Sequence, residues 1–299
     1  MAIKENTRKW LNKQNISLEG KRVLVTGANS GIGYKTVETA LFLGAGIIMA
    51  CRNMEKAEAA RENLLKDYPD AKISIMRLDI SDFVSIDSFA DEIISKEIDI
   101  DVFVNNAGTF HRKGITKDGF ESVTGTNYFG VYRLTEQLLP YLKKLPHKVY
   151  YFNTISLVHK YGKVNFEDFY YSQKYNHFAV YARSKLCLAK YTYYLSKKYD
   201  NSNLIFYMIH PGTTITALAA DGFPVIIKKA ANAFNWLFNS PEKSSLEMVY
   251  VLSKNLPAGS IAGPWLFEVW GYPKQNRVRN RVKEGAEELI SFTEKEICK

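Results

Sequence analysis

The chain has 299 residues, of which 46% are hydrophobic, and it carries a net charge of +9 at pH 7. These values are typical of a globular protein that buries a real core, as one large α/β domain or two small ones. The three cysteines, Cys51, Cys187 and Cys298, show no metal-ligand spacing, so we expect no bound metal and a reducing compartment rather than a disulfide framework.

The N-terminal stretch MAIKENTRKWLNKQN lacks the apolar core of a signal peptide, and no apolar run approaches the ~18 residues that a membrane span needs. We therefore expect a cytoplasmic protein without a membrane span. The positive charge favours attraction to phosphorylated cofactors. Basic residues cluster between positions 274 and 283, but acidic residues follow directly, so we do not expect nucleic acid as a partner.

Residues 1–20 are expected to form a short amphipathic lead-in, with Trp10 and Leu11 packed on the flank of the following domain. Residues 21–52 then contain a strand, a glycine turn, a helix that starts at Ile32, and a second strand. Such a βαβ unit can bind a dinucleotide, because glycines let the backbone approach the pyrophosphate and the helix N-terminus offers free N–H groups.

The glycine turn has the spacing G-x-x-x-G-x-G, given by Gly27, Gly31 and Gly33. This spacing departs from the general G-x-G-x-x-G fingerprint of dinucleotide-binding proteins. The position of the turn between a strand and a helix is what supports nucleotide binding, against the alternative of a merely structural turn.

Strand and helix patterns alternate along the rest of the chain. Helices are expected at 54–68, 119–142, 179–199 and 281–297. Two more helices are expected, one that follows a cap at Ser81 or Asp82 and one that begins at Ser240. Strands are expected at 72–78, 101–105, 148–153, 204–210 and 265–269. The alternation predicts an α/β fold: a Rossmann-like, doubly wound parallel sheet of about seven strands with helices on both faces. We expect a single domain over residues 21–299.

Two segments interrupt the alternation. Residues 160–178 are rich in Tyr and Asn, and we expect a loop or short helices there. Residues 213–240 are apolar and follow the sixth strand, so we interpret them as a lid over an apolar substrate. A core-packing helix and a subunit contact are the alternatives for this second segment.

Candidate site residues follow the strands, and in an open parallel sheet ligands bind outside the carboxyl ends of the strands. A carboxylate about 20 residues beyond the glycine turn would favour NAD by binding the ribose 2′-hydroxyl. That place holds Cys51 and Arg52. Because a guanidinium can hold a 2′-phosphate with its planar fork, we predict NADP(H) in preference to NAD(H).

Tyr181 and Lys185 are four residues apart and share one face of a helix. A phenol with a pKa near ~10 is a poor base at neutral pH, but an adjacent ammonium favours the phenolate and lowers that pKa. Tyr181 could then exchange a proton with a carbonyl or alcohol oxygen. The spacing alone is weak evidence, because the chain has 19 tyrosines and Tyr175 and Tyr194 lie nearby.

Three motifs in order, TGANSGIG at 26–33, NNAG at 105–108 and YARSK at 181–185, resemble the short-chain dehydrogenase/reductase family. The resemblance covers roughly residues 18–220. The 25 residues from Ser156 to Tyr181 are a longer separation than is usual in the family and are similar to the subgroup of retinol dehydrogenases and related carbonyl reductases.

The resemblance implies roles for individual residues. Ser156 holds the substrate oxygen, and Asn127 kinks the long helix and holds a water linked to Lys185. Asp79 accepts from the adenine amine, while the Pro211–Gly212 loop covers the nicotinamide. The expected cofactor-binding residues are Gly27, Asn29, Ser30, Gly31, Ile32, Gly33, Arg52, Asp79, Ile80, Asn106, Ala107, Gly108, Tyr181, Lys185, Pro211, Gly212, Thr213 and Thr216.

The sequence therefore predicts an NADP(H)-dependent oxidoreductase that transfers a hydride between nicotinamide and an apolar carbonyl or alcohol. The alternative is a catalytically inactive, dinucleotide-sensing binding protein. A homodimer or homotetramer is compatible with the family. The spacings of His159, His177 and His210 suit neither a metal site nor a catalytic triad, and we interpret them as ordinary loop or strand-end residues.

Overall fold

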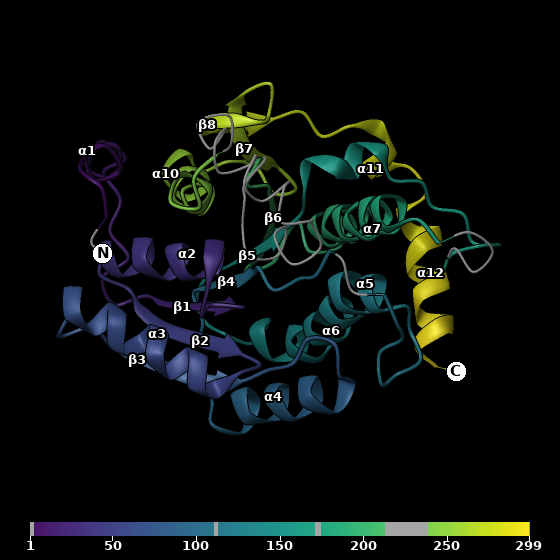
Figure 1. Ribbon diagram of the computed structural model, residues 1–299, viewed down its shortest axis with the longest axis horizontal. Helices are drawn as coiled ribbons and strands as arrows, with labels where there is room; N and C mark the ends of the chain where they lie inside the picture. Colours follow the sequence, from purple (N-terminus) through teal and green to yellow (C-terminus); the bar gives the residue numbers. More distant parts are fainter. Residues whose placement is uncertain (1–2, 111–112, 171–174, 213–238, 299) are drawn as a thin grey trace, which may run out of the picture.

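The computed structural model describes residues 3–110, 113–170, 175–212 and 239–298. Its centre is an eight-stranded sheet with the strand order β3-β2-β1-β4-β5-β6-β7-β8 (Figure 1). The first seven strands pair in parallel, and β8 pairs antiparallel with β7. The predicted α/β, Rossmann-like parallel sheet with helices on both faces is confirmed.

The first half of the chain follows the predicted alternation closely. Its elements are α1 (Glu5–Lys13), β1 (Arg22–Thr26), α2 (Gly31–Phe42), β2 (Gly46–Cys51), α3 (Met54–Asp67), β3 (Ile73–Arg77), α4 (Phe83–Ser95) and β4 (Val102–Asn105). In α1, Leu11 is buried and Trp10 stacks on Tyr272 at 5.5 Å between ring centroids, so this helix packs on the flank as predicted. Asp82 rather than Ser81 caps α4, because the Val84 N–H donates to Asp82 Oδ1 at 3.1 Å.

The second half contains irregular turns between the regular elements. Its elements are α5 (Ser122–Thr124), the π-helix η1 (Gly125–Phe129), α6 (Gly130–Leu142), β5 (Val149–Thr154), the 3₁₀ helix η2 (Leu157–Tyr161), α7 (His177–Lys198), β6 (Leu204–Ile209), the 3₁₀ helix η4 (Lys243–Ser245), α10 (Glu247–Lys254), β7 (Ile261–Leu266), β8 (Trp270–Asn276), α11 (Asn280–Lys283) and α12 (Ala286–Ile297). No helix in these described parts of the chain is long and apolar enough to cross a membrane.

The C-terminal elements differ from the prediction. The edge strand expected at 265–269 is instead the end of β7 followed by the turn of a hairpin, in which the Val269 N–H donates to the Leu266 carbonyl and Phe267 and Glu268 both have positive φ. The sheet therefore has eight strands rather than about seven. The helix expected from Ser240 begins only at Glu247, after η4, and Gly285 at φ +62° separates α11 from α12.

Two apolar cores hold the layers together. Successive strand residues point to opposite faces, so Leu24 enters one core while Val23 and Val25 enter the other. Helices α4, α6, α7 and α12 complete the first core, and α1, α2, α3 and α10 complete the second (Figure 1). The parallel register then places the carboxyl ends of β1, β4, β5 and β6 at one edge of the sheet.

Candidate active site

The glycine turn lies between β1 and α2, where it packs tightly against the loop after β4. Gly27 and Gly31 have φ of +65° and +56°, a region that favours glycine. A Cβ at Gly33 would lie 2.3 Å from the Gly27 carbonyl oxygen and 2.5 Å from Asn106 Nδ2. Ser30, the N-cap of α2, makes no side-chain cap bond. The turn is thus a backbone cradle at a helix N-terminus, which fits a pyrophosphate.

The loop after β4 is tied to the end of β1. The Asn106 and Ala107 N–H groups donate to Thr26 Oγ1 at 3.0 and 2.9 Å, and Asn106 Nδ2 donates to the Thr26 carbonyl at 3.0 Å. The side chain of Asn106 is therefore structural. A Cβ at Gly108 would lie 2.9 Å from Asn127 Oδ1 and 3.6 Å from Lys185 Nζ, so this loop passes directly over the buried polar groups of the site.

Arg52 follows β2 with 62% of its side chain exposed, and its Nη1 lies 3.9 Å from Asp79 Oδ2. Asp79 Oδ1 also accepts from the Ser81 N–H at 3.0 Å and from the Ser81 hydroxyl at 2.6 Å. The side chain of Ile80 is buried in the first core, and its carbonyl oxygen would lie 1.9 Å from a Cβ at Gly130. The Ile80 backbone therefore packs closely against the start of α6, and the Ile80 side chain packs in the core.

Ser156, Tyr181 and Lys185 meet at the carboxyl end of β5. The Ser156 hydroxyl lies beside the Tyr181 side chain, close enough to lower the pKa of the phenol. Lys185 Nζ lies 5.9 Å from the centre of the Tyr181 ring and donates to the Thr154 carbonyl at 2.8 Å. The Phe110 ring meets the Tyr181 ring edge-on at 4.6 Å between centroids, a contact that the sequence analysis missed because no motif contains Phe110.

The predicted lowering of the Tyr181 pKa by Lys185 is not found. Burial raises the pKa of Tyr181, and the hydrogen bond from Ser156 opposes this rise only in part. Burial also lowers the pKa of Lys185 to about 8. The physical reason is desolvation, which disfavours the charged form of both groups, while the ammonium is directed at the Thr154 carbonyl.

Asn127 lies in the π-helical turn η1, so the predicted irregularity in the long helix is confirmed. Its side chain is fully buried. Oδ1 accepts from the Thr109 N–H at 2.7 Å, and Nδ2 donates to the Thr109 carbonyl at 2.8 Å and to Ser184 Oγ at 3.1 Å. These bonds join the irregular helix to the 105–110 loop and to α7. The water link to Lys185 stays a prediction.

The loop after β6 is held by the Ser244 side chain of η4 and by the backbone of the turn between β7 and β8. The Pro211 carbonyl accepts from the Ser244 hydroxyl at 2.9 Å, and Gly212 has φ of +70°. A Cβ at Gly212 would lie 2.4 Å from the Val269 carbonyl oxygen, so only glycine fits there. Thr213, Thr216 and most of the lid expected at 213–240 lie outside the described residues.

His159 lies in the turn η2 and His210 directly follows β6, as loop and strand-end residues were predicted to do. Both are buried, with 1% and 0% exposure. His159 Nδ1 lies 2.6 Å from the Ser156 carbonyl oxygen, and His210 Nε2 lies 3.5 Å from Glu268 Oε2. Sequence spacing could not reveal the contact between His210 and Glu268, because these residues lie on segments that meet only in the folded sheet, whereas the contact between His159 and Ser156 is local.

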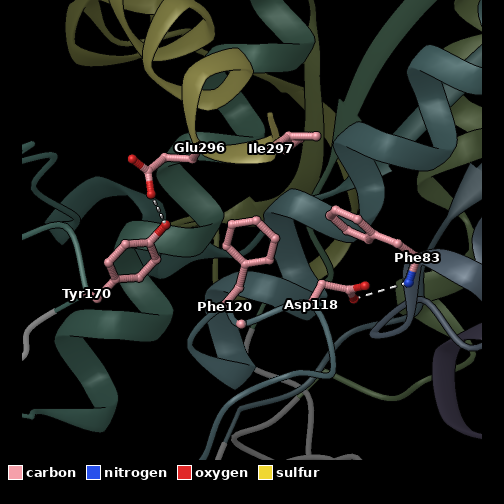
Figure 2. Close-up of a pocket in the computed structure, with 7 residues that line it drawn as sticks. Phe83, Asp118, Phe120, Tyr170, Glu296 and Ile297 are labelled. Carbon is pink, nitrogen blue, oxygen red and sulfur yellow. Dashed lines mark hydrogen bonds between the residues drawn. The ribbon is translucent and has the colours of Figure 1, made fainter. Parts of the chain in front are cut away.

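A pocket of about 320 Å³ lies elsewhere, beside the start of α4 and the end of α12 (Figure 2). Its lining includes Phe83, Asp118, Phe120, Tyr170 and Glu296. Tyr170 donates to Glu296 at 2.9 Å, and the Phe83 N–H donates to Asp118 at 3.1 Å. The pocket shares no residue with the Ser156, Tyr181 and Lys185 group, so we place the reaction at the strand ends and not in this pocket.

The parallel sheet, the glycine cradle and the polar groups at the strand ends define a dinucleotide-binding oxidoreductase of the Rossmann type. A model of the short chain dehydrogenase family matches residues 21–224. Retinol dehydrogenase 14 of Mus musculus is 35% identical over 248 residues, which cover 78% of this chain and 74% of that protein. Retinol dehydrogenase 13 of Homo sapiens is 38% identical over 205 residues, or 68% and 61% of the two chains.

The crystal structure of an uncharacterised protein from Mycobacterium paratuberculosis is also similar, with a TM-score of 0.77, 29% identity and 95% of each chain covered. The chain belongs to the short-chain dehydrogenase/reductase family, and within it resembles the retinol dehydrogenases. It is therefore an oxidoreductase that acts on CH–OH groups with NAD(P).

Proposed function

We propose that the protein is an NADP(H)-dependent oxidoreductase that interconverts an apolar carbonyl compound and its alcohol. The observation that carries the proposal is the convergence of the Ser156 hydroxyl, the Tyr181 phenol and the Lys185 ammonium at one strand end. The dinucleotide, when bound, supplies or accepts the hydride. The glycine turn, Gly108 and the Pro211–Gly212 loop are the parts of the chain that would hold it.

Tyr181 is the proton donor in the direction of reduction. Its raised pKa keeps the phenol protonated at neutral pH, which suits a general acid better than a general base. Ser156 lies beside the same phenol and would hold the substrate oxygen next to it while charge develops there. Lys185, with a pKa of about 8, is mostly charged at pH 7 and fixes this end of β5 through the Thr154 carbonyl.

The preference for NADP(H) rests on Arg52. Its exposed guanidinium follows β2 and has a carboxylate partner only at 3.9 Å, so it is accessible to a phosphate. The ratio of turnover with NADPH to turnover with NADH tests this preference. A clear preference for NADH would reject the Arg52 argument.

An apolar substrate is supported by the aromatic side chains around the site. Phe110 packs on Tyr181, and the exposed, mutually tilted rings of Tyr161 and Phe178, which follow Ser156 and precede Tyr181 in the chain, lie 6.3 Å apart between centroids. The retinol dehydrogenases named above suggest a retinoid as the first compound to assay. A panel of retinal, steroid ketones, quinones and small aldehydes, followed by loss of NADPH absorbance, tests the substrate class. Turnover of only small polar aldehydes would contradict it.

The alternative of a dinucleotide-sensing protein without catalysis is tested by the same panel, since such a protein would bind NADPH and turn over nothing. The lid at 213–240, the homodimer or homotetramer and the cytoplasmic location stay predictions. The three cysteines are all free, which supports a reducing compartment.

A further inference from the structure

A charged bridge connects three segments around the proposed site. Lys160 belongs to η2, His210 follows β6, and Glu268 lies in the turn between β7 and β8. Lys160 Nζ lies 2.5 Å from Glu268 Oε2, and His210 Nε2 lies 3.5 Å from the same oxygen. The exposed fractions of these side chains are 11% for Lys160, 0% for His210 and 22% for Glu268, so the bridge is largely withdrawn from water.

A hydrogen bond to the His210 ring shows which of its two nitrogens carries the proton. The Gly212 N–H donates to His210 Nδ1 at 3.3 Å, which makes Nδ1 an acceptor and leaves the proton on Nε2. Nε2 lies 3.5 Å from Glu268 Oε2, within ion-pair distance of the carboxylate but outside hydrogen-bond geometry. A Cβ at Gly263 would lie 2.2 Å from His210 Nε2, so the ring is seated directly against β7. His210 therefore connects the Pro211–Gly212 loop to Glu268.

The other end of the bridge reaches the turn after Ser156. This turn runs through His159, whose Nδ1–H donates to the Ser156 carbonyl at 2.6 Å, to Lys160. Because His159 is buried and its pKa is lowered to about 4 by burial, it stays neutral and keeps this bond at physiological pH. Lys160 then ties the same turn to Glu268.

Glu268 itself has an uncommon backbone. Its φ is +60°, and that of the neighbouring Phe267 is +51°, a region that residues other than glycine, asparagine and aspartate rarely adopt. Phe267 is 86% exposed, so its side chain does not anchor this turn by apolar packing. Glu268 is held by the Lys160 ammonium and the neutral His210 ring, and its contacts with His210 and Lys160 lower the pKa of Glu268 to about 2 despite burial.

We propose that Glu268 is a positioning residue. Through Lys160 and His210 it keeps the turn after Ser156 and the Pro211–Gly212 loop in fixed positions relative to each other. The inference rests on the proposed function, in which Ser156 holds the substrate oxygen and the Pro211–Gly212 loop lies beside the nicotinamide. Glu268 touches neither Ser156 nor Tyr181 directly, and its effect is transmitted by the two side chains that it binds.

The kinetic test compares E268Q, E268D and K160M with wild type, using NADPH and the best carbonyl substrate. Misplacement of reacting groups by fractions of an ångström is expected to lower kcat roughly tenfold in E268Q, with partial rescue in E268D, which keeps the charge. The double variant K160M/E268Q should be about as active as the worse of the two single variants. Both substitutions disrupt the same bridge, so their effects on kcat should not add. The matched control is E92Q, which removes the exposed Lys96–Glu92 pair and should leave kcat unchanged.

A bridge that only stabilises the fold would lower the melting temperature of E268Q but leave kcat unchanged well below that temperature, and this result would overturn the proposal. Amide hydrogen exchange gives a readout without turnover. Exchange in peptides covering 155–162 and 204–212 should accelerate in E268Q and not in E92Q. If exchange in these two peptides is unchanged in E268Q, the positioning role of Glu268 is overturned, even if wild type turns over no substrate. If wild type is inactive but exchange accelerates in E268Q, only the proposed function is rejected.

Discussion

Replacing Tyr181 by Phe removes one hydroxyl and leaves the ring in place. The ring keeps its edge-on contact with Phe110, and Lys185 keeps its bond to the Thr154 carbonyl. The variant loses at most one hydrogen bond to Ser156, and such a bond contributes only about 0.5–1.5 kcal/mol to the free energy of unfolding. Y181F should therefore fold and bind NADPH.

The loss in rate should be far larger than the loss in stability. General acid catalysis contributes about 10²- to 10⁴-fold, which corresponds to roughly 2.7–5.5 kcal/mol of activation free energy. Carbonyl reduction by Y181F, followed by NADPH absorbance, should fall by at least the lower value. Titration of NADPH by fluorescence in the same preparation separates this loss from a loss of cofactor binding.

The same helix supplies a matched control. Tyr194 and Lys198 have the same spacing as Tyr181 and Lys185, and Lys198 Nζ lies 5.4 Å from the Tyr194 ring centroid. Tyr194 lies more than three helical turns further along α7, away from the strand ends. Y194F should keep full activity. Near-normal turnover in Y181F, or an equal loss in both variants, would refute the assignment of Tyr181 as the proton donor.

Three further predictions concern the cofactor and the buried lysine. In R52D, loss of a charge-assisted bond worth roughly 1.5–3 kcal/mol should lower the NADPH-to-NADH preference about 10- to 100-fold, and an unchanged ratio of kcat/KM would contradict the role of Arg52. In G33A, the added Cβ would lie 2.3 Å from a backbone oxygen, so the free energy of unfolding should fall by about 1–3 kcal/mol and the affinity for NADPH should drop. Urea titrations measure the change in stability, and the control is G46A, whose Cβ would lie no closer than 3.8 Å to another atom. Burial lowers the pKa of Lys185 from 10.5 to about 8, so the folded protein binds fewer protons there than the unfolded chain between these values. The stability of wild type relative to K185M should therefore rise by up to about 3 kcal/mol from pH 8 to pH 10.5, and a flat or falling difference in urea unfolding would refute this.

The sequence by itself determined the parts of this protein that local chemistry controls. Alternating apolar periods predicted the parallel sheet, and the glycines between β1 and α2 predicted the cradle, because both patterns act over a few neighbouring residues. Sequence motifs also predicted the irregular helical turn at Asn127 and the family to which the chain belongs. Spacing alone could not separate Tyr181–Lys185 from Tyr194–Lys198, since the two pairs differ only in their place relative to the strand ends.

Only the tertiary structure decided the features that depend on distant segments. The direction of the Tyr181 pKa shift follows from how completely the fold removes water from the crevice, which no pair spacing records. The hairpin that ends the sheet depends on pairing between β7 and β8, and it overrides the local pattern that predicted a single strand at 265–269. Lys160, His210 and Glu268 meet because three sheet-edge loops converge, so their contact is a property of the folded chain and not of any one stretch of it.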